Sequence, residues 1–375
     1  MEHTEKTMIE SIEKFCITKI GSISSNIDST NEFPLHLWNE MGSMGLLGVT
    51  APEKYGGLNA SYSLHCKIMS QISEHSASVG LSYAAHSNLC INQITLFGNE
   101  HQKSIFLPYL IAGKLVGALA MSEPNSGSDI VSMKLKAKQH GDNFILNGEK
   151  CWTTNGTEAG IIIVYAKTSP DLGSKGITAF LVPNGVKGLI KSSKLDKFGM
   201  RGSNTCSLFF DNVQVHKNNI LGGINCGIRV MMSGLDVERL ILSAGPVGIQ
   251  KACLRIALDY AKSRRQFDKR ICDFQLIQGK IADMYTRLEA SEAFLDKAAK
   301  DADQKCLSRE LAASVYLFCS ESGVKTALDT IQILGGNGYT NEYNAGRLLR
   351  DAKLYEIGGG TTEIRRMLIA RELCK

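Results

Sequence analysis

The spacing of apolar residues changes twice along this chain of 375 residues. Up to about residue 115, and again after about residue 225, apolar side chains recur every three or four positions, as on one face of a helix. Between these zones, short β-branched runs alternate with turns that contain glycine and asparagine. Short strands separated by such turns are typical of an antiparallel sheet. We therefore expect helices, then a β-domain, then helices again.

The two helical zones contain several predicted elements. On the N-terminal side, periodicity predicts helices over residues 5–20, 32–44 and 61–74, with a loop at 51–58. On the C-terminal side, one apolar stripe begins at Leu311 and ends at Gly335-Gly336, a C-cap signal. A second stripe follows Phe274, Ile277, Ile281, Met284, Leu288, Ser291, Leu295 and Ala298. Long helices joined by short connections predict an antiparallel bundle.

The middle zone predicts strands over residues 143–147, 160–167, 177–182 and 206–215. These strands are not interleaved with helices, and no G-x-G-x-x-G follows a strand, which excludes a Rossmann unit. The predicted fold class is therefore α+β with several domains. We expect an α-helical domain at 1–115, a β-domain at 116–222 and a helical bundle at 223–375.

Composition narrows the classes of function. Hydrophobic residues make up 43% and charged residues 21%, as in an ordinary globular protein. The net charge of +5 permits a nucleotide ligand without demanding nucleic acid. The histidines lack metal-ligand spacing and the 11 cysteines form no C-x-x-C pair, which favours reduced thiols and no metal. No window reaches the roughly 18 apolar residues of a membrane helix, so no membrane insertion is expected.

Several segments have both an ordinary and a functional interpretation. LAMSEPNSGSD at 119–129 has the residues of a plain loop, or offers donors to a ligand. Trp152, in KCWTTNG, could belong to the core or stack on a flat cofactor. Arg264 could lie on a solvated face or bind a pyrophosphate. The glycines at 335–336 and 358–360 could simply connect helices, or let the backbone approach a ligand.

The segment GLDVERL at 234–240 places charges on an otherwise apolar helix. Glu238 and Arg239 could form an internal ion pair or lie at an exposed edge. Alternatively, apolar surroundings would disfavour the charged carboxylate and raise its pKa toward that of a useful general base.

In this order, the motifs resemble the acyl-CoA dehydrogenase family, and within it the isovaleryl branch. The resemblance extends from about Lys6 to the C-terminus. It is densest at GLSYAAHSNLCINQ (80–93), AMSEPNSGSD (120–129), LDKFGMRGSNTC (195–206), MSGLDVERL (232–240), QGKIADMYTRLEA (278–290) and GGNGYTNEYNAGRLLRDAKLYEIGGGT (335–361). It implies an N-terminal helical domain, a central antiparallel β-domain and a C-terminal four-helix bundle, in agreement with the periodicity.

The resemblance also implies FAD as the cofactor and a homotetramer built as a dimer of dimers. One set of residues would lie along the flavin or close its site: Leu119, Ala120, Met121, Ser122, Ser128, Trp152, Thr153, Thr154, Thr361, Thr362 and Glu363. A second set would come from a neighbouring subunit and hold the pyrophosphate and adenosine: Arg264, Gln275, Gln332, Ile333, Leu334, Gly335 and Gly336.

The implied reaction is α,β-dehydrogenation of an acyl-CoA, with electron-transfer flavoprotein as the acceptor. A carboxylate removes the α-proton, and hydrogen bonds to the thioester oxygen, one of them from Gly359 or its neighbour, stabilise the developing charge. Most family members have this base in a Y-E-G-T motif, where this chain has Gly359-Gly360-Thr361. The isovaleryl branch has its base at the position of Glu238, so Glu238 is the predicted base and Glu356 the reserve candidate.

The expected substrate is a short branched thioester, first of all isovaleryl-CoA, oxidised to 3-methylcrotonyl-CoA in leucine catabolism. Gly358 and Gly359 would leave room for the β-branch, and Gly359 replaces an alanine of the branch, so other branched or short straight chains stay open. Arg229 stands where tyrosine is expected beside CoA. The residues expected at the substrate are Ser128, Ser174, Lys175, Asp236, Val237, Glu238, Arg239, Gly359 and Gly360.

Two other functions fit the same fold. A flavin-containing DNA-binding protein would use a basic face, for which Lys134, Lys136 and Lys138 and the cluster at 264–270 are candidates. A solvated face explains these charges more simply, so no nucleic acid is expected. An oxidase would pass its electrons to oxygen instead. The expected compartment is the cytoplasm of a bacterium, or the mitochondrial matrix for a mature eukaryotic form.

Overall fold

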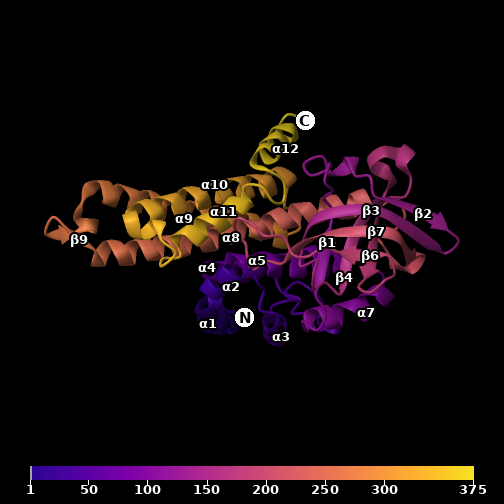
Figure 1. The fold of residues 1–375 in the computed structure, drawn as a ribbon, viewed down its shortest axis with the longest axis horizontal. Coiled ribbons are helices and arrows are strands. Elements are labelled where there is room, and N and C mark those ends of the chain that lie inside the picture. The colour runs from indigo at the N-terminus through magenta and orange to yellow at the C-terminus, as the bar shows by residue number, and fades with distance from the viewer. Residues whose placement is uncertain (1) are drawn as a thin grey trace.

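The computed structural model describes residues 2–375 and has the three zones that the periodicity predicts (Figure 1). Helices form the N-terminal zone, drawn in indigo, and the long C-terminal bundle, drawn in orange and yellow. The sheet lies at one end of this bundle. The predicted fold class is therefore confirmed, whereas the domain boundaries within it remain predictions.

Local signals set the ends of the N-terminal helices. The Ser61 hydroxyl caps α4 by accepting from the N–H of Leu64, and Asn99 and Gln102 form a reciprocal capping box at α7. The helix predicted over 32–44 begins only at His36, because Pro34 disfavours helical backbone in the preceding residue. The helices are α1 (Glu2–Phe15), α2 (Ser24–Thr30), α3 (His36–Ser43), α4 (Tyr62–His75), α5 (Ala77–Ala84), α6 (Gln93–Phe97) and α7 (Glu100–Ile111), with π-helical segments at Cys16–Ile20 and Ala85–Asn92.

The eight strands of the sheet follow the order β6-β7-β3-β2-β4-β5-β8, with β1 beside β4. They are β1 (Gly117–Ala120), β2 (Lys136–His140), β3 (Asn143–Thr154), β4 (Ile161–Lys167), β5 (Ile177–Pro183), β6 (Leu189–Lys191), β7 (Thr205–His216) and β8 (Ile220–Leu221). Most neighbours are antiparallel, but β1 and β2 run parallel to β4, so the sheet is mixed. Strand β1 escapes sequence analysis because GALA contains no β-branched residue.

The C-terminal zone is built around α8 (Gly227–Ser263), which packs against α4, α9 and α10. The predicted stripe along α9 is confirmed, since Met284, Leu288, Ser291, Leu295 and Ala298 are all buried. Helix α10 ends at Gly335, whose φ of 60° explains the glycine. The other helices are α9 (Gln275–Asp303), α10 (Arg309–Leu334), α11 (Ala345–Tyr355) and α12 (Thr362–Leu373), and a small hairpin pairs β9 (Arg265–Gln266) with β10 (Lys269–Arg270).

Helix α8 determines which residues can share a site. At 37 residues it is about 55 Å long. It begins at the sheet, where Gly227 lies against Ile177, and ends at the β9–β10 hairpin on the opposite side of the molecule (Figure 1). By length and composition it could cross a membrane, but 83% of its most apolar window is buried inside the protein, as expected for a core helix. Residues near its two ends cannot belong to one site within a single chain.

Candidate active site

The first two motifs, far apart in sequence, meet at the edge of the sheet. The carbonyl of Ser122 accepts from the N–H of Cys151 at 2.9 Å, so the 119–129 segment lies directly beside β3. A Cβ placed on Gly127 would be 3.8 Å from the Trp152 ring. The polar loop and the indole therefore form one surface.

Trp152 is presented on this surface rather than packed in the core. Its side chain is 60% exposed and its φ is +54°, a left-handed conformation that few bulky residues adopt. It lies in the register irregularity of β3 between Lys150 and Thr153, which turns the indole outward. The chain's other tryptophan, Trp38, is 2% exposed, so the core interpretation holds for Trp38 only.

The residues of this surface fit a flat cofactor such as a flavin. The indole offers an exposed aromatic face for stacking. Next to it, the buried Thr153 hydroxyl has no hydrogen-bond partner among residues 2–375, and Met121 and Ser122 are only half-buried. An isoalloxazine ring, which has a wide apolar face and polar edges, suits such a surface.

A buried ion pair beneath this surface escapes sequence analysis. The Lys150 ammonium is fully buried and donates to the carbonyl of Met121 and to Glu123, each at 2.9 Å. The Glu123 carboxylate also accepts from the N–H groups of Lys134 and Leu135. Lys150 thus holds the loop 119–129 to β3. Its only signal in the sequence is its place in the KCWTTNG motif.

Glu238 occupies a buried position on α8. It is 8% exposed, and its Oε2 has no hydrogen-bond partner within the part of the chain that the structure describes. Burial raises the pKa of Glu238 to about 7, against the opposing effect of Arg239 and Arg365. A carboxylate with such a pKa is partly charged near neutral pH and is basic enough to take a proton. This agrees with the expectation that apolar surroundings raise the pKa of Glu238 toward that of a general base.

The glycine turn after α11 is held next to this carboxylate by two residues that sequence analysis misses. Arg365, fully buried on α12, donates to the carbonyls of Tyr355 and Gly358 at 2.6 and 2.8 Å. Tyr316 donates to the same Gly358 carbonyl at 3.0 Å, and the Arg365 guanidinium stacks on its ring. Both residues act electrostatically on Glu238, so the turn and the carboxylate share one neighbourhood.

The turn itself differs in part from expectation. Gly359 and Gly360 have φ of 66° and 94°, which explains two of the three glycines. The room expected beside Gly359 is taken, because a Cβ there would lie 3.0 Å from Tyr316 and 3.3 Å from Leu242. A Cβ on Gly358 would meet nothing closer than 3.5 Å. Of Gly358 and Gly359, which were expected to leave room for a branch, only Gly358 has free space beside it.

The reserve base, Glu356, is already engaged. Its carboxylate pairs with Lys353 at 2.5 Å, one turn back on α11. Asp236 is likewise paired, with Arg239 at 3.1 Å and Arg309 at 3.4 Å. Among these three carboxylates, only Glu238 is without an ion pair.

The remaining predicted residues fall into two groups. Ser128, Ser174 and Lys175 are exposed loop residues on the sheet side, and Val237 is half-buried on α8. Thr361 caps α12, accepting from the N–H of Ile364, which places Thr362 and Glu363 in its first turn, next to the glycine turn. Of these residues, only Ser128 and Val237 lie on the segments that carry the loop surface and Glu238.

The second predicted set lies at the other end of the molecule. Arg264 follows the last residue of α8, and Gln275 begins α9 close to the hairpin. The segment after Gln332–Gly336 joins them there, since Asn337 donates to Tyr260 at 2.9 Å. The structure brings these residues to one another but not to Trp152, so they can serve the same site only from another subunit.

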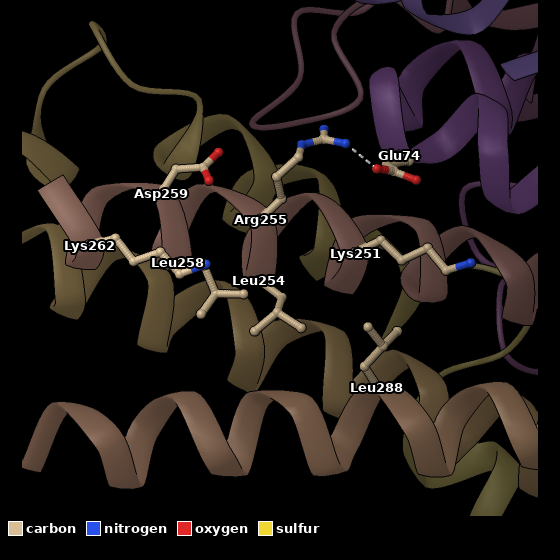
Figure 2. A pocket seen from close by; sticks show the side chains of 8 residues that line it. All are labelled: Glu74, Lys251, Leu254, Arg255, Leu258, Asp259, Lys262 and Leu288. Atoms are coloured by element: carbon tan, nitrogen blue, oxygen red, sulfur yellow. Dashed lines mark hydrogen bonds and ion pairs between the residues drawn. The ribbon is translucent and has the colours of Figure 1, made fainter. Parts of the chain in front are cut away.

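A groove of about 390 Å³ along α8 is separate from these residues (Figure 2). Leucines form its floor, and an ion pair between Glu74 and Arg255 crosses its rim. Its nearest floor residue on α8, Leu254, is about 24 Å along the helix from Glu238. It is lined by Glu74, Lys251, Leu254, Arg255, Leu258, Asp259, Lys262 and Leu288. The groove therefore takes no part in chemistry at Glu238.

The exposed indole on the sheet and the unpaired carboxylate on the bundle suit an enzyme that stacks a flat cofactor and removes a proton from its substrate. Models of the acyl-CoA dehydrogenase N-terminal, middle and C-terminal domains match residues 2–114, 118–213 and 225–374. The chain belongs to the acyl-CoA dehydrogenase family, which confirms the resemblance noted in its motifs, and it is an oxidoreductase.

Individual relatives cover the whole chain. The mitochondrial isovaleryl-CoA dehydrogenase of Oryza sativa is 53% identical over all of this chain and 92% of its own length. The mitochondrial 2-methylacyl-CoA dehydrogenase of Solanum tuberosum is 50% identical over 100% of this chain and 92% of its own length. Among solved structures, butyryl-CoA dehydrogenase of Megasphaera elsdenii has a TM-score of 0.97 at 33% identity, covering 99% and 98%. The FAD complex of PigA has a TM-score of 0.95 at 29% identity, covering 100% and 98%.

Proposed function

We propose that this protein is an FAD-dependent dehydrogenase that oxidises isovaleryl-CoA to 3-methylcrotonyl-CoA. The observation that carries the proposal is the buried Glu238, unpaired on α8, beside a glycine turn that lacks the carboxylate of the common family motif. The 53% identity to the isovaleryl-CoA dehydrogenase of Oryza sativa, over the entire chain, supports this substrate.

Different residues of the chain have different roles in the reaction. Glu238 takes the α-proton, while the β-hydrogen leaves with its electron pair and a Cα=Cβ double bond forms. FAD, when bound against the loop 119–128 and Trp152, supplies the acceptor for that hydride. Burial excludes water from the carboxylate and raises its pKa. The difference between this pKa and that of the weakly acidic α C–H group of the thioester is therefore smaller.

The glycine turn supplies donors for the thioester oxygen. Within residues 2–375, the N–H groups of Gly359 and Gly360 take part in no backbone hydrogen bond. Arg365 and Tyr316 fix this turn from behind through the Gly358 carbonyl. A rigid N–H aimed at an oxygen on which charge develops lowers the barrier to α-proton removal.

The alternative substrate is a 2-methyl-branched or short straight acyl-CoA. The 2-methylacyl-CoA dehydrogenase relative is nearly as similar as the isovaleryl-CoA dehydrogenase, so overall identity does not separate the two branches.

We also propose electron-transfer flavoprotein as electron acceptor and a homotetramer as the assembly. A structure described as an electron-transferring flavoprotein of Acidaminococcus fermentans is among those of similar fold. The far end of the bundle exposes three large apolar side chains, Phe267, Leu276 and Tyr339, next to Arg264. A second copy seated there would cover them and carry Arg264 to its neighbour's cofactor. Mitochondrial relatives suggest the matrix for a eukaryotic source, and a bacterial source would imply the cytoplasm.

The experiment that tests this function is anaerobic titration of the FAD-loaded protein with isovaleryl-CoA, 2-methylbutanoyl-CoA, butyryl-CoA and octanoyl-CoA. We expect loss of the oxidised flavin absorbance at the lowest concentration of isovaleryl-CoA. Preferential bleaching by 2-methylbutanoyl-CoA would indicate that the substrate is a 2-methyl-branched acyl-CoA instead. Absence of bleaching by every thioester would overturn the proposed reaction.

A further inference from the structure

The cation next to the base is tied to a carboxylate that the proposed reaction does not use. Arg239 follows Glu238 on α8 and is 8% exposed, and its Nη1 donates to Asp236 Oδ1 at 3.1 Å. Asp236 and Arg239 are three residues apart, a spacing at which side chains on a helix meet. Arg239 Nε and Glu238 Oε2 are both buried and have no hydrogen-bond partner within the described part of the chain. The guanidinium is therefore drawn to the preceding turn of α8 and not to the base.

A second guanidinium near Glu238 is fixed in another way. Arg365 of α12 donates to Ser320 and to two backbone carbonyls, all of them neutral acceptors. Both guanidinium groups favour the charged form of Glu238 and so oppose the effect of burial on its pKa. The other titratable side chains that face Glu238 are Tyr165 of β4 and Tyr316 of α10, and burial raises the pKa of both. Of the two cations beside the base, only the one on α8 is balanced by a carboxylate.

Asp236 is itself held from a second helix. Arg309, the first residue of α10, approaches Asp236 Oδ2 with its Nε at 3.4 Å and Glu372 of α12 with its Nη1 at 3.7 Å. Asp236 thus lies between two cations, one beside the base and one nearer the surface, and its side chain is 20% exposed. Charges of alternating sign run from α12 to the residue next to Glu238.

We propose that Asp236 is a positioning residue for the base: it holds the Arg239 guanidinium away from Glu238, which keeps Glu238 basic enough to remove the α-proton. This inference rests on the proposed function, in which Glu238 is the base. Without the charge of Asp236, the guanidinium is free to turn to Glu238, a buried carboxylate that has no ion pair. A neighbouring arginine lowers the pKa of a carboxyl group by about 1–3 units and makes the carboxylate a weaker base.

The test replaces Asp236 by asparagine, which keeps the shape of the side chain and removes its charge. In FAD-loaded Asp236→Asn, the midpoint of the rise of kcat/KM for isovaleryl-CoA with pH should move from about 7 to about 6 or lower. The plateau at high pH should also be lower, because the base is weaker. Asp236→Glu restores the charge and should return the midpoint toward 7. Arg309→Gln removes the cation on the other side of Asp236 and should raise the midpoint.

Asp329→Asn is the matched control. Asp329 also pairs with two cations of the bundle, Lys280 and Arg287, and its side chain is likewise 20% exposed. It lies about 20 Å along α10 from Tyr316, which faces the base. Its loss of charge should leave the pH midpoint unchanged. A midpoint that stays near 7 in Asp236→Asn, or that moves equally in Asp329→Asn, would overturn the inference.

The apo protein gives a readout that needs neither cofactor nor substrate. Because ionisation of buried Glu238 destabilises the fold as pH rises toward about 7, Glu238→Gln should stabilise the apo protein against urea at pH 8. This stabilisation should be smaller in the Asp236→Asn background, where Arg239 already favours the charged form. Failure of the unchanged protein to oxidise any thioester would count against the proposed function. The apo comparison would then decide alone whether Asp236 controls the charge of Glu238, and an equal stabilisation in both backgrounds would show that it does not.

Discussion

At the scale of single residues, Glu238 combines features that rarely coincide. It is a carboxylate on the longest helix, buried, and without an ion pair, while its neighbours Asp236 and Glu356 are both paired. Pairing lowers a carboxylate's basicity, and burial raises it. The contrast among the three explains why one of them can act as a base near neutral pH.

Glu238→Gln is expected to retain FAD and bind acyl-CoA but to lose turnover by about 10²–10⁴-fold, the usual contribution of a positioned base. In the unchanged enzyme only the carboxylate form is active, so kcat/KM should rise with pH up to about 7 and then level off. Steady-state rates from pH 5.5 to 8.5 on both proteins measure this. Full activity of the variant would transfer the role of base to Glu356.

The apo form of the same variant offers a folding control. Burial raises the pKa of Glu238 in the folded protein from an ordinary value of 4.5 to about 7, so its contribution to stability is present at low pH and is lost as pH rises through about 7. Glu238→Gln should therefore be more stable than the unchanged apo protein at pH 8, by about 3 kcal/mol, and similar at pH 4. Urea unfolding at the two pH values measures this difference.

At the scale of elements, the loop 119–129, which we propose to face the flavin, is positioned by a strand to which it does not belong. The Lys150 ammonium reaches from β3 to the Met121 carbonyl and to Glu123. The desolvation of a fully buried ammonium is costly, and its bonds to carboxylate and carbonyl offset that cost only in one geometry. Lys150 accordingly fixes the loop 119–129 against β3, the two segments that carry the proposed cofactor surface.

Lys150→Met is expected to weaken FAD binding by at least about tenfold, because it leaves Glu123 as an unpaired buried charge and frees the loop. The measurement is the rise in Tm on adding FAD, which reports affinity by linkage. Lys191→Met is the control, since Lys191 bonds the Thr157 and Ala159 carbonyls elsewhere in the sheet.

An equal loss of FAD affinity in both lysine variants would show that general damage to the sheet is responsible. The double variant Glu123→Gln/Lys150→Met removes both buried charges and keeps the test open if Lys150→Met fails to fold. We expect it to be more stable than Lys150→Met while binding FAD no better.

At the scale of the whole molecule, the loop 196–203 joins all three zones. The Met200 N–H donates to Asp351 of α11 at 2.6 Å, and Arg201 donates to the Asp28 carbonyl of α2 at 2.7 Å. Arg350 of α11 pairs with the Asp28 carboxylate. The β-domain is thus clamped to both helical zones, which keeps the loop surface around Trp152 aligned with Glu238.

Gly199→Ala is expected to weaken this junction. A Cβ at Gly199 would lie 2.2 Å from the Arg350 carbonyl oxygen, a clash with backbone that must be relieved by moving the loop. Such overpacking costs about 1–3 kcal/mol. Gly346→Ala is the control, because a Cβ there meets nothing within 4 Å and alanine favours a helix. Urea midpoints that fall equally in both variants would contradict this account.

The sequence alone predicted the order of helical zone, sheet and helical bundle, most of the long helices and the strands β3, β4, β5 and β7, but not the short strand β1. Apolar periodicity is a local property, so it predicted the stripe of α9, the cap at Gly335 and Glu238 on a helix, and the motifs led to the family. Only the tertiary structure decided which side chains contact one another and which stay exposed. The exposed Trp152, the clamp of Arg365 on the glycine turn, the pairing of Asp236 with Arg309, and the remoteness of Arg264 all depend on segments distant in sequence. Which side chain loses its water, and which finds a bond, is set by packing between elements, and a one-dimensional pattern does not contain it.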